Sequence, residues 1–313
     1  MAQIKLTISI GTYNRSQCIQ RQVRDVLEQL EEGVQLYVFD NASDRPVSDL
    51  FTKEELSRFT IFRNTINIGR DQNQVRSLEN VKEGWVWTLS DDDIIKKDAV
   101  RVVLKYINKH PKSCYINFGN KKESSIHNFQ ELTSYFSIVG TFGISFFQSS
   151  CVYNIDRIKK SLYWFNEFLS SQIGQICMVL KHMENNKGEM CLFTTTSIIE
   201  EVPPGGWSTK DFIINSSILF DKFHYRKREL KGTLFKGMGD MYFPMLSTKK
   251  MSFSDFCYIY SYLIFKIGII NVIRYNFITF NGSLAKFVLP EKFYKFVKSK
   301  WAQKYNNSID EKI

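Results

Sequence analysis

Hydrophobic and polar positions alternate along the first 120 residues in two periods, which predict strands and helices in turn. Short apolar runs predict strands, and apolar positions three or four residues apart predict helices with one buried face. The predicted strands are Leu6–Ile10, Val34–Phe39, Thr60–Arg63, Trp85–Leu89 and Tyr115–Phe118, and the predicted helices span 16–32, 50–59, 71–81 and 99–108.

Strands that alternate with helices in this way are typical of a parallel, doubly wound α/β sheet. Polar turns follow three of the strands: Gly11–Arg15 (GTYNR), Asp40–Asp44 (DNASD) and Ser90–Asp93 (SDDD). Ligands of such sheets bind beyond the carboxyl ends of the strands. We therefore expect the three turns to meet at one edge of the sheet and to form a binding site there.

The turn Ser90–Asp93 places three successive carboxylates at the end of an apolar run. Carboxylates this close together repel one another, and they lose hydration when they are buried. A divalent cation would offset both costs, and oxygen ligands of this kind suit Mg²⁺ or Mn²⁺. The pattern predicts a metal–phosphate site; the alternative is an acidic turn that caps a helix beginning near Ile94.

The second half of the chain gives weaker patterns. The polar residues 119–140 predict a loop, and 190–199 predict a strand. Residues 200–207 combine two prolines, two glycines and a tryptophan, which predicts a mobile loop with an aromatic tip or a simple turn. We expect the lone histidines of this half, His182 and His224, to face solvent.

The formal net charge of +10 is concentrated at the end of the chain. Residues 222–313 hold 17 Lys and Arg against 6 Asp and Glu, whereas the first 221 residues hold 25 against 26. This asymmetry predicts a body at 1–220 and a basic, aromatic, helical region at 221–313. A region with this excess of positive charge is expected to bind a polyanionic partner. An anionic membrane surface is favoured over nucleic acid, because no nucleic-acid-binding motif accompanies the charge.

Two segments of the basic region bear on membrane binding. Residues 286–304 interleave Phe and Trp with Lys at helical spacing, which predicts an amphipathic surface helix or an ordinary helix packed on the body. Residues 256–273 are apolar and of borderline length for a membrane span, but the central Lys266 would be costly there, so packing on the body stays open.

The start of the chain and its cysteines indicate the compartment. The first residues lead into a strand pattern with no signal-peptide features, and the six cysteines show no CxxC spacing. We therefore expect reduced thiols and a cytoplasmic protein, peripheral on the inner face of the cell membrane.

Four motifs, each weak alone, occur in one order: Ser9–Arg15 (SIGTYNR), Phe39–Asp44 (FDNASD), Asn64–Asn73 (NTINIGRDQN) and Leu89–Ile94 (LSDDDI). Together they resemble the GT-A glycosyltransferases of family 2. Within that family the chain is most similar to the bacterial O-antigen and capsule type, abequosyltransferases included. The resemblance implies a GT-A fold for residues 1–220, which is a Rossmann-like, mostly parallel sheet with flanking helices. It implies that 1–110 bind the nucleotide sugar and that 111–220 form the acceptor-binding half. It also implies a UDP-, GDP-, CDP- or dTDP-sugar donor and a DxD motif that uses Mn²⁺ or Mg²⁺.

The resemblance further implies roles for individual residues. Asp92 corresponds to the metal ligand of the DxD motif, Asp93 is a further acid of the metal site, and Ser90 stands where the first acid is usual. The implied nucleotide-sugar-binding residues are Thr12, Tyr13, Asn14, Arg15, Asp40, Asn67, Gly69, Arg70, Asn73 and Asp91.

An inverting transferase needs a general base for the acceptor hydroxyl. The family supplies it from an acid pair, but Ser170–Gln175 (SSQIGQ) stands in that place here. Glu167 is the first remaining candidate, with Glu200 and Glu201 as alternatives.

The expected function is the metal-dependent, inverting transfer of a hexose or deoxyhexose to a lipid-linked oligosaccharide or polysaccharide, in cell-surface polysaccharide biosynthesis. One alternative is a nucleotidyltransferase that acts on sugar phosphates. The other is a non-catalytic subunit that binds a nucleotide sugar.

Overall fold

The computed structural model describes residues 6–138, 141–201, 209–226 and 252–269, together with 228, 230 and 233. The chain divides into two compact units. The first unit comprises 1–132 and 144–206, and the second comprises 133–143 and 207–313. The longer segment of the second unit therefore begins at residue 207, whereas the charge distribution placed the boundary at 220/221.

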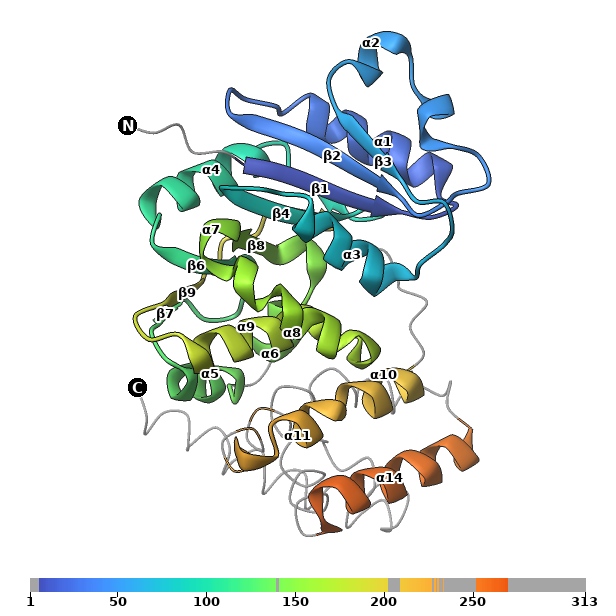
Figure 1. Cartoon of the computed structure of the whole chain (residues 1–313). Helices are drawn as coiled ribbons and strands as arrows, with labels where there is room; N and C mark the ends of the chain where they lie inside the picture. Colours follow the sequence, from blue (N-terminus) through green and yellow to red (C-terminus); the bar gives the residue numbers. More distant parts are fainter. Residues whose placement is uncertain are drawn as a thin grey trace, which may run out of the picture. The chain divides into compact units, whose positions relative to one another are not determined.

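One mixed sheet of eight strands forms the centre of the first unit (Figure 1). The strands are β1 (Leu6–Thr12), β2 (Val34–Asp40), β3 (Thr60–Arg63), β4 (Trp85–Ser90), β6 (Ser113–Asn117), β7 (Ser124–Ile126), β8 (Cys151–Asn154) and β9 (Met190–Phe193). Their order is β3-β2-β1-β4-β8-β6-β9-β7. The first four are parallel, β8 runs antiparallel between β4 and β6, β9 is parallel to β6, and β7 closes the edge antiparallel to β9.

The parallel pairing brings the polar turns to one edge of the sheet. In the register of β1, Thr12 lies opposite Asp40 of β2, and Gly11 lies opposite Ser90 of β4. The predicted meeting of the turns at the carboxyl ends of these strands is thus confirmed. The mostly parallel α/β architecture is confirmed with it.

Helices flank this sheet. They are α1 (Ser16–Leu27), η1 (Val47–Leu50), α2 (Lys53–Leu56), α3 (Arg70–Glu79), α4 (Ala99–Lys109), α5 (Phe129–Phe136), α6 (Thr141–Ser145), η2 (Gln148–Ser150), α7 (Ile155–Ile158), η3 (Lys159–Ser161), α8 (Leu162–Glu167), η4 (Leu169–Ser171) and α9 (Gly174–Asn185). A continuous apolar core joins β1, β2 and β4 to one face of α1 and one face of α4. Burial of these faces supplies the main stabilisation of the unit.

Three elements differ from the sequence prediction. The expected helix at 50–59 is interrupted, because Thr52 and Glu55 form a reciprocal capping box that starts the separate helix α2. The expected loop at 119–140 contains β7 and α5, whose apolar residues are buried. The expected strand at 190–199 is split into β9 and β10 (Ile199–Glu201), because β10 leaves the main sheet and pairs with β5 (Ile94–Ile95).

The start of α9 is tightly packed against α8. A Cβ atom on Gly174 would lie 2.5 and 2.7 Å from two ring carbons of the buried Phe165. The side-chain amide of Gln175 is also buried and donates to the carbonyl of Phe146 at 2.7 Å. The stretch that stands in the place of the acid pair therefore serves packing in this chain.

Within the second unit, the structure describes α10 (Thr209–Ser216), α11 (Ile218–Lys222), η5 (His224–Arg226) and α14 (Phe253–Ile267). The Tyr262 hydroxyl of α14 lies 2.6 Å from the Ser217 hydroxyl, and Lys266 pairs with Asp221 at 2.5 Å. Among the described residues, no helix combines the length and apolarity needed to cross a bilayer. The segments 202–208 and 286–304 lie outside the described residues.

Candidate functional site

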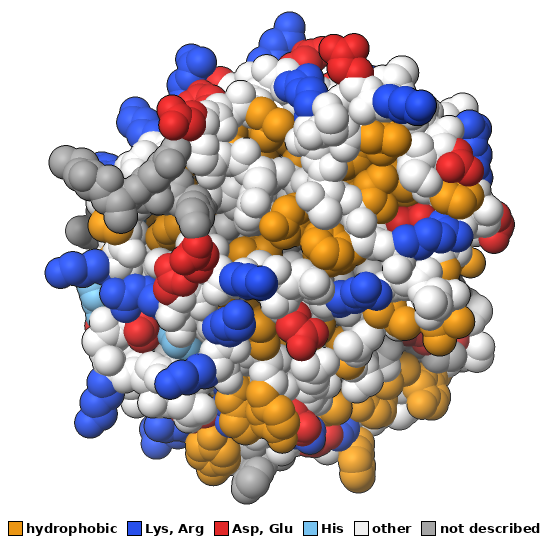
Figure 2. Space-filling model, turned by 45° about the horizontal axis from the view of Figure 1, so that its top comes forward, with side chains coloured by type: hydrophobic (Ala, Val, Ile, Leu, Met, Phe, Trp, Pro, Cys, Tyr) orange, Lys and Arg blue, Asp and Glu red, His pale blue; other side chains and the backbone are white. Residues whose placement is uncertain are grey.

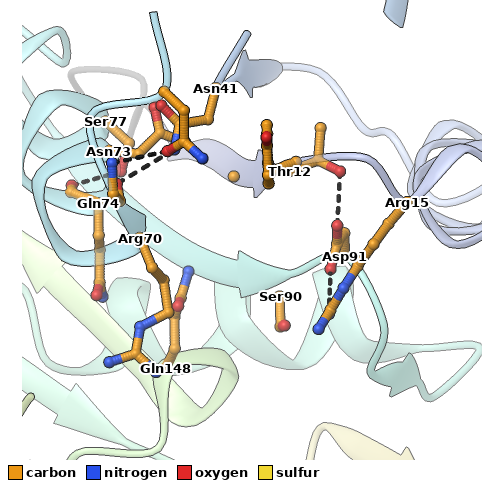
Figure 3. Close-up of a pocket in the computed structure, with 14 residues that line it drawn as sticks. Thr12, Arg15, Asn41, Arg70, Asn73, Gln74, Ser77, Ser90, Asp91 and Gln148 are labelled. Carbon is orange, nitrogen blue, oxygen red and sulfur yellow. Dashed lines mark hydrogen bonds and ion pairs between the residues drawn. The ribbon is translucent and has the colours of Figure 1, made fainter. Parts of the chain in front are cut away.

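A pocket of about 310 Å³ opens at the carboxyl edge of β1 and β4 (Figure 3). This volume is at the lower end of the range for small-molecule sites, ~300–1,000 Å³. The turns after β1, β2 and β4 contribute to the pocket, together with α3 and η2. Its lining residues are Gly11, Thr12, Tyr13, Arg15, Asn41, Asn67, Gly69, Arg70, Asn73, Gln74, Ser77, Ser90, Asp91 and Gln148.

One end of the pocket, the acid end, is centred on the buried carboxylate of Asp91. The Thr12 hydroxyl donates to this carboxylate at 2.6 Å, and the Arg15 guanidinium donates to its other oxygen at 3.0 Å (Figure 3). Burial raises the pKa of Asp91, whereas the hydrogen bonds from Thr12 and Arg15 oppose that shift. Thr12 ends β1 and Arg15 lies in the turn that follows, so these hydrogen bonds link the end of β1 to the residue directly after β4.

Arg15 also bridges to the next acid. Its guanidinium donates to Asp92 at 2.6 Å, and the other carboxylate oxygen of Asp92 accepts from the Ser90 hydroxyl at 2.5 Å. The Asp92 side chain is 30% exposed, so it can be reached from solvent. A single guanidinium therefore partly neutralises two adjacent carboxylates.

Asp93 does not join the other two acids. It is buried and accepts from the Ser149 hydroxyl, and it does not line the pocket. Burial, together with the charges of Asp92 and Asp91, raises the pKa of Asp93 to about 6. The structure therefore corrects the expectation that Asp93 belongs to a metal site, because its carboxylate is used inside the fold.

The opposite end of the pocket, the amide wall, consists of interlocked asparagines. Asn41 donates to Asn67 at 2.8 Å, and Asn64 donates to both Asn41 (2.7 Å) and Asn73 (3.0 Å). Asn73 in turn donates to the carbonyl of Phe39 at 3.1 Å. These bonds link β2, the turn before α3, and α3 itself into a rigid wall without net charge.

Two glycines shape this wall. A Cβ on Gly11 would lie 3.1 Å from the side-chain nitrogen of Asn73, so the close approach of β1 to α3 needs a residue without a side chain. Gly69 has φ +87°, a conformation that favours glycine, and directly precedes the first turn of α3. The pocket thus faces the start of α3, and the amino end of a helix favours an anion.

One polar group of the pocket lacks a partner within the protein. The Gln74 amide nitrogen is buried, and the structure gives it no hydrogen-bond acceptor. An unpaired buried donor costs about 1–3 kcal/mol. Since Gln74 lines the pocket, a bound ligand that supplies an acceptor would remove this cost.

Eight of the ten predicted nucleotide-sugar-binding residues line the pocket, and two, Asp40 and Asn14, do not. The fully buried carboxylate of Asp40 accepts from the backbone N–H groups of Ser43 and Val47 and pairs with Arg63, so it shapes the turn after β2. Asn14 exchanges hydrogen bonds with Asp44. Asp40 and Asn14 therefore stabilise the turns that form the pocket. Asn41, next to Asp40, lines the pocket instead.

Sequence reasoning missed four lining residues: Asn41, Gln74, Ser77 and Gln148. Gln74 and Ser77 lie four and seven positions after Arg70, so helical periodicity would have placed them on its face. Asn41 directly follows the predicted Asp40. Gln148 carries no such signal, because tertiary folding alone brings η2 beside β4.

The three candidate bases lie in different places. Glu167 ends α8 and does not line the pocket. Glu200 and Glu201 lie in β10, where Glu201 is opposite Ile94, the residue directly after Asp93. Pairing of β10 with β5 therefore brings these two glutamates beside the acidic turn, which sequence distance alone did not reveal.

The acid end fits a divalent metal by its chemistry. Asp91 and Asp92 offer carboxylate oxygens, the ligand type that Mg²⁺ and Mn²⁺ prefer. Between them they already hold a cation, the guanidinium of Arg15, whose side chain is 52% exposed. A metal at Asp92 would replace one positive charge by another.

The central sheet and its flanking helices form an α/β fold of the GT-A type. Residues 7–153 match the sequence profile of Glycosyl transferase family 2. The acid end and the amide wall of the pocket both lie within the matched residues. No curated protein sequence matches the chain.

Solved structures share the fold over most of the chain. The S. aureus TarS structure of residues 1–349 has a TM-score of 0.63 at 13% identity and covers 96% of this chain and 92% of its own. Its complex with UDP-GlcNAc gives 0.61 at 12% identity, with 96% and 89% coverage. The mannosyltransferase PcManGT from Pyrobaculum calidifontis, in complex with GDP-Man and Mn²⁺, gives 0.52 at 10% identity, with 88% and 86% coverage.

The raised pKa of Asp93 predicts a specific pH dependence of stability. Because its pKa in the folded protein, about 6, exceeds the ordinary 3.8, protonation favours folding. The free energy of unfolding should therefore fall as pH rises from about 4 to 6, by up to about 3 kcal/mol. Asp93→Asn should remove this fall and be more stable than wild type at pH 7.5, with little difference at pH 4.

Urea unfolding between pH 4 and 8, in EDTA, measures this difference. Asp98→Asn is the control, because Asp98 is exposed and makes no side-chain cap of α4. A stability difference for Asp93→Asn that stays constant with pH would contradict the assignment.

Proposed function

We propose that the protein transfers a sugar from a nucleotide-sugar donor to a lipid-linked oligosaccharide or polysaccharide acceptor, with inversion, in cell-surface polysaccharide biosynthesis. The observation that carries the proposal is the pocket of the family 2 domain, which joins a charged acid end to an uncharged amide wall. Structures of the same fold bind UDP-GlcNAc and GDP-Man, which supports a nucleotide-sugar donor.

The two ends of the pocket suit the two parts of such a donor. The side-chain amides of Asn67 and Gln74 offer donors to a nucleoside without placing a charge against it, while Asn41 is held by bonds within the wall. The start of α3 and the side chain of Arg70 favour the negative diphosphate. The sugar would then lie toward Asp91, at the end of β4.

Asp92, with Asp91 beside it, would hold Mn²⁺ or Mg²⁺. Such a metal acts as a Lewis acid that neutralises the leaving diphosphate. Arg15 has a second role in this proposal: its guanidinium, which donates to both carboxylates, would offset their mutual repulsion before the metal binds.

The general base is proposed to come from β10. A base must lie within hydrogen-bond reach of the acceptor hydroxyl. None of the three candidate glutamates lines the pocket, but the pairing of β10 with β5 puts Glu201 opposite Ile94, directly after the acidic turn. We therefore favour the β10 glutamates over Glu167.

Loss of the Asp92 carboxylate should abolish most transfer activity. The removal of one group that stabilises developing charge typically costs 10²–10³-fold in kcat, about 2.7–4 kcal/mol. Asp92→Asn should show a loss of this size when nucleoside diphosphate release is measured with a panel of UDP-, GDP-, CDP- and dTDP-sugars and Mn²⁺.

Asp98→Asn should release diphosphate at the wild-type rate. Mn²⁺ titration followed by electron paramagnetic resonance gives a readout independent of turnover, and Asp92→Asn should weaken this binding. The enzymatic proposal fails if wild type releases no diphosphate from any donor with lipid-linked acceptor present.

Substitution of the base should lower kcat and leave donor binding intact. Glu200→Gln and Glu201→Gln are tested separately, and one of them should lose about 10²–10⁴-fold, the usual contribution of a general base. Glu167→Gln should stay within a few-fold of wild type. The reverse ranking, with intact donor binding in all three variants, would return the role to Glu167.

We also propose that the basic C-terminal region holds the protein at an anionic membrane surface. On the face shown in Figure 2, basic and acidic side chains are interspersed. The excess of basic residues in the sequence lies in 222–313. Within α14 the Phe265 side chain is 83% exposed, and Ile264 and Tyr258 are 38% and 52% exposed. Exposed apolar side chains next to basic segments suit a lipid surface.

Charge reversal should weaken lipid binding. Each Lys near an anionic surface contributes about 1 kcal/mol, so Lys292, Lys295 and Lys298 changed together to Glu should lower vesicle affinity about 100-fold. Sedimentation with phosphatidylglycerol vesicles measures this. The control carries Glu at Lys97, Lys105 and Lys109, three exposed positions of the first unit. Equal losses in both variants would show a non-specific charge effect and overturn the proposal.

A further inference from the structure

A second cluster of chemically active side chains lies in the first unit, at the edge of the sheet opposite to the pocket. Cys114 belongs to the amino end of β6, His182 to α9, and Glu189 to the connection from α9 to β9. One ligand atom from each lies within 4.8 Å of the others. Since β6 runs parallel to β4, the amino end of β6 faces away from the carboxyl edge that forms the pocket.

His182 is held as a metal ligand would be held. The sequence predicted a solvent-facing ring, but the residue is 2% exposed. Its Nδ1 lies 2.9 Å from the Ser161 hydroxyl, which fixes the ring. Its Nε2 is buried and has no hydrogen-bond partner; the nearest carboxylate oxygen, on Glu189, lies 3.7 Å away. A ring fixed through one nitrogen and open at the other is typical of metal-binding histidine.

A fourth ligand can come from Cys191, which stands outside this group of three but contacts Cys114. The Sγ atoms of Cys114 and Cys191 lie 3.7 Å apart. This is far longer than a disulfide, ~2.05 Å. It matches the ~3.8 Å expected between two sulfurs that each bind one tetrahedral zinc ion at ~2.3 Å. Cys191 is the second residue of β9, directly beside β6.

The charges of the cluster balance around a divalent ion. Arg157 donates to both carboxylate oxygens of Glu189, at 3.0 and 3.1 Å, and so orients this side chain. Two thiolates and one carboxylate carry three negative charges, and Arg157 supplies one positive charge. A divalent cation supplies the remaining two, so the buried site would be neutral.

We propose that Cys114, His182, Glu189 and Cys191 form a structural zinc site. Sulfur and imidazole ligands select zinc over the hard cations that suit the carboxylates of the pocket. A closed set of four protein ligands leaves no position for substrate, so the role is to fasten α9 to β6 and β9. This site is independent of the proposed transferase activity.

Metal content and cobalt spectroscopy of the full-length protein test the site. Protein purified without chelator should contain about one zinc per chain. After zinc removal, Co²⁺ should give the visible bands of a tetrahedral site and a sulfur-to-cobalt absorption in the near ultraviolet, and Zn²⁺ should displace it. Zinc removal should also lower the Tm, and zinc should restore it.

Three variants locate the ligands. Cys114→Ser should reduce the sulfur-to-cobalt band and weaken Zn²⁺ binding about 100-fold. His182→Asn should weaken binding similarly while it keeps a hydrogen-bonding group near Ser161. Cys177→Ser, a buried cysteine of α9 outside the cluster, is the matched control and should bind like wild type.

If a variant fails to fold, the metal content and the Co²⁺ spectrum of the wild-type protein still test the proposal. Absence of zinc together with no tetrahedral Co²⁺ spectrum would overturn the proposal, as would a Cys114–Cys191 disulfide found by mass spectrometry in freshly purified protein. Equal loss of Zn²⁺ binding in Cys114→Ser and Cys177→Ser would overturn it too, since binding would then depend on the general packing of the unit.

Discussion

The burial of Asp91 is the constraint around which the site is organised. A carboxylate at the end of a buried strand loses much of its hydration, and Thr12 and Arg15 replace it with two direct hydrogen bonds. Thr12 ends β1, and Arg15 lies in the turn that follows. Hydrogen bonds between Asn14 and Asp44 hold this turn against the turn after β2. The three turns therefore cannot be changed independently, because each satisfies polar groups of the next.

The two ends of the pocket differ in their charge. At the acid end, negative charge is concentrated and must be met by a cation, which is Arg15 in this structure. At the amide wall, the asparagines satisfy one another and hold a polar surface of no net charge. A densely hydrogen-bonded network is rigid, and it binds without first reorganising. In the described part of the chain, the side-chain oxygen of Asn64 and the side-chain nitrogen of Gln74 are buried here without a partner, and Gln74 lines the pocket.

Much of this arrangement could be predicted from the sequence, because it depends on local patterns of apolar and polar residues. Strands and turns of the first half are set by local periodicity, and parallel pairing then brings successive strand ends together. What local pattern cannot give is the direction of a side chain within a turn: Asp92 is partly exposed, while the adjacent Asp93 is buried against Ser149 from a distant segment. For the same reason the sequence could not place Gln148 in the pocket or bury His182, since both positions depend on tertiary packing.

The relation between α9 and β10 bears on where the catalytic base comes from. The start of α9 has no room for acidic side chains, because Gly174 lies against Phe165 and the Gln175 amide is buried. Strand β10 pairs with β5 outside the main sheet. It carries two glutamates, and this pairing puts them next to the acidic turn. A base is defined by its reach to the acceptor hydroxyl and not by its place in the chain. The absence of an acid pair at the start of α9 is therefore no evidence against the proposed transfer, because β10 carries two glutamates next to the acidic turn.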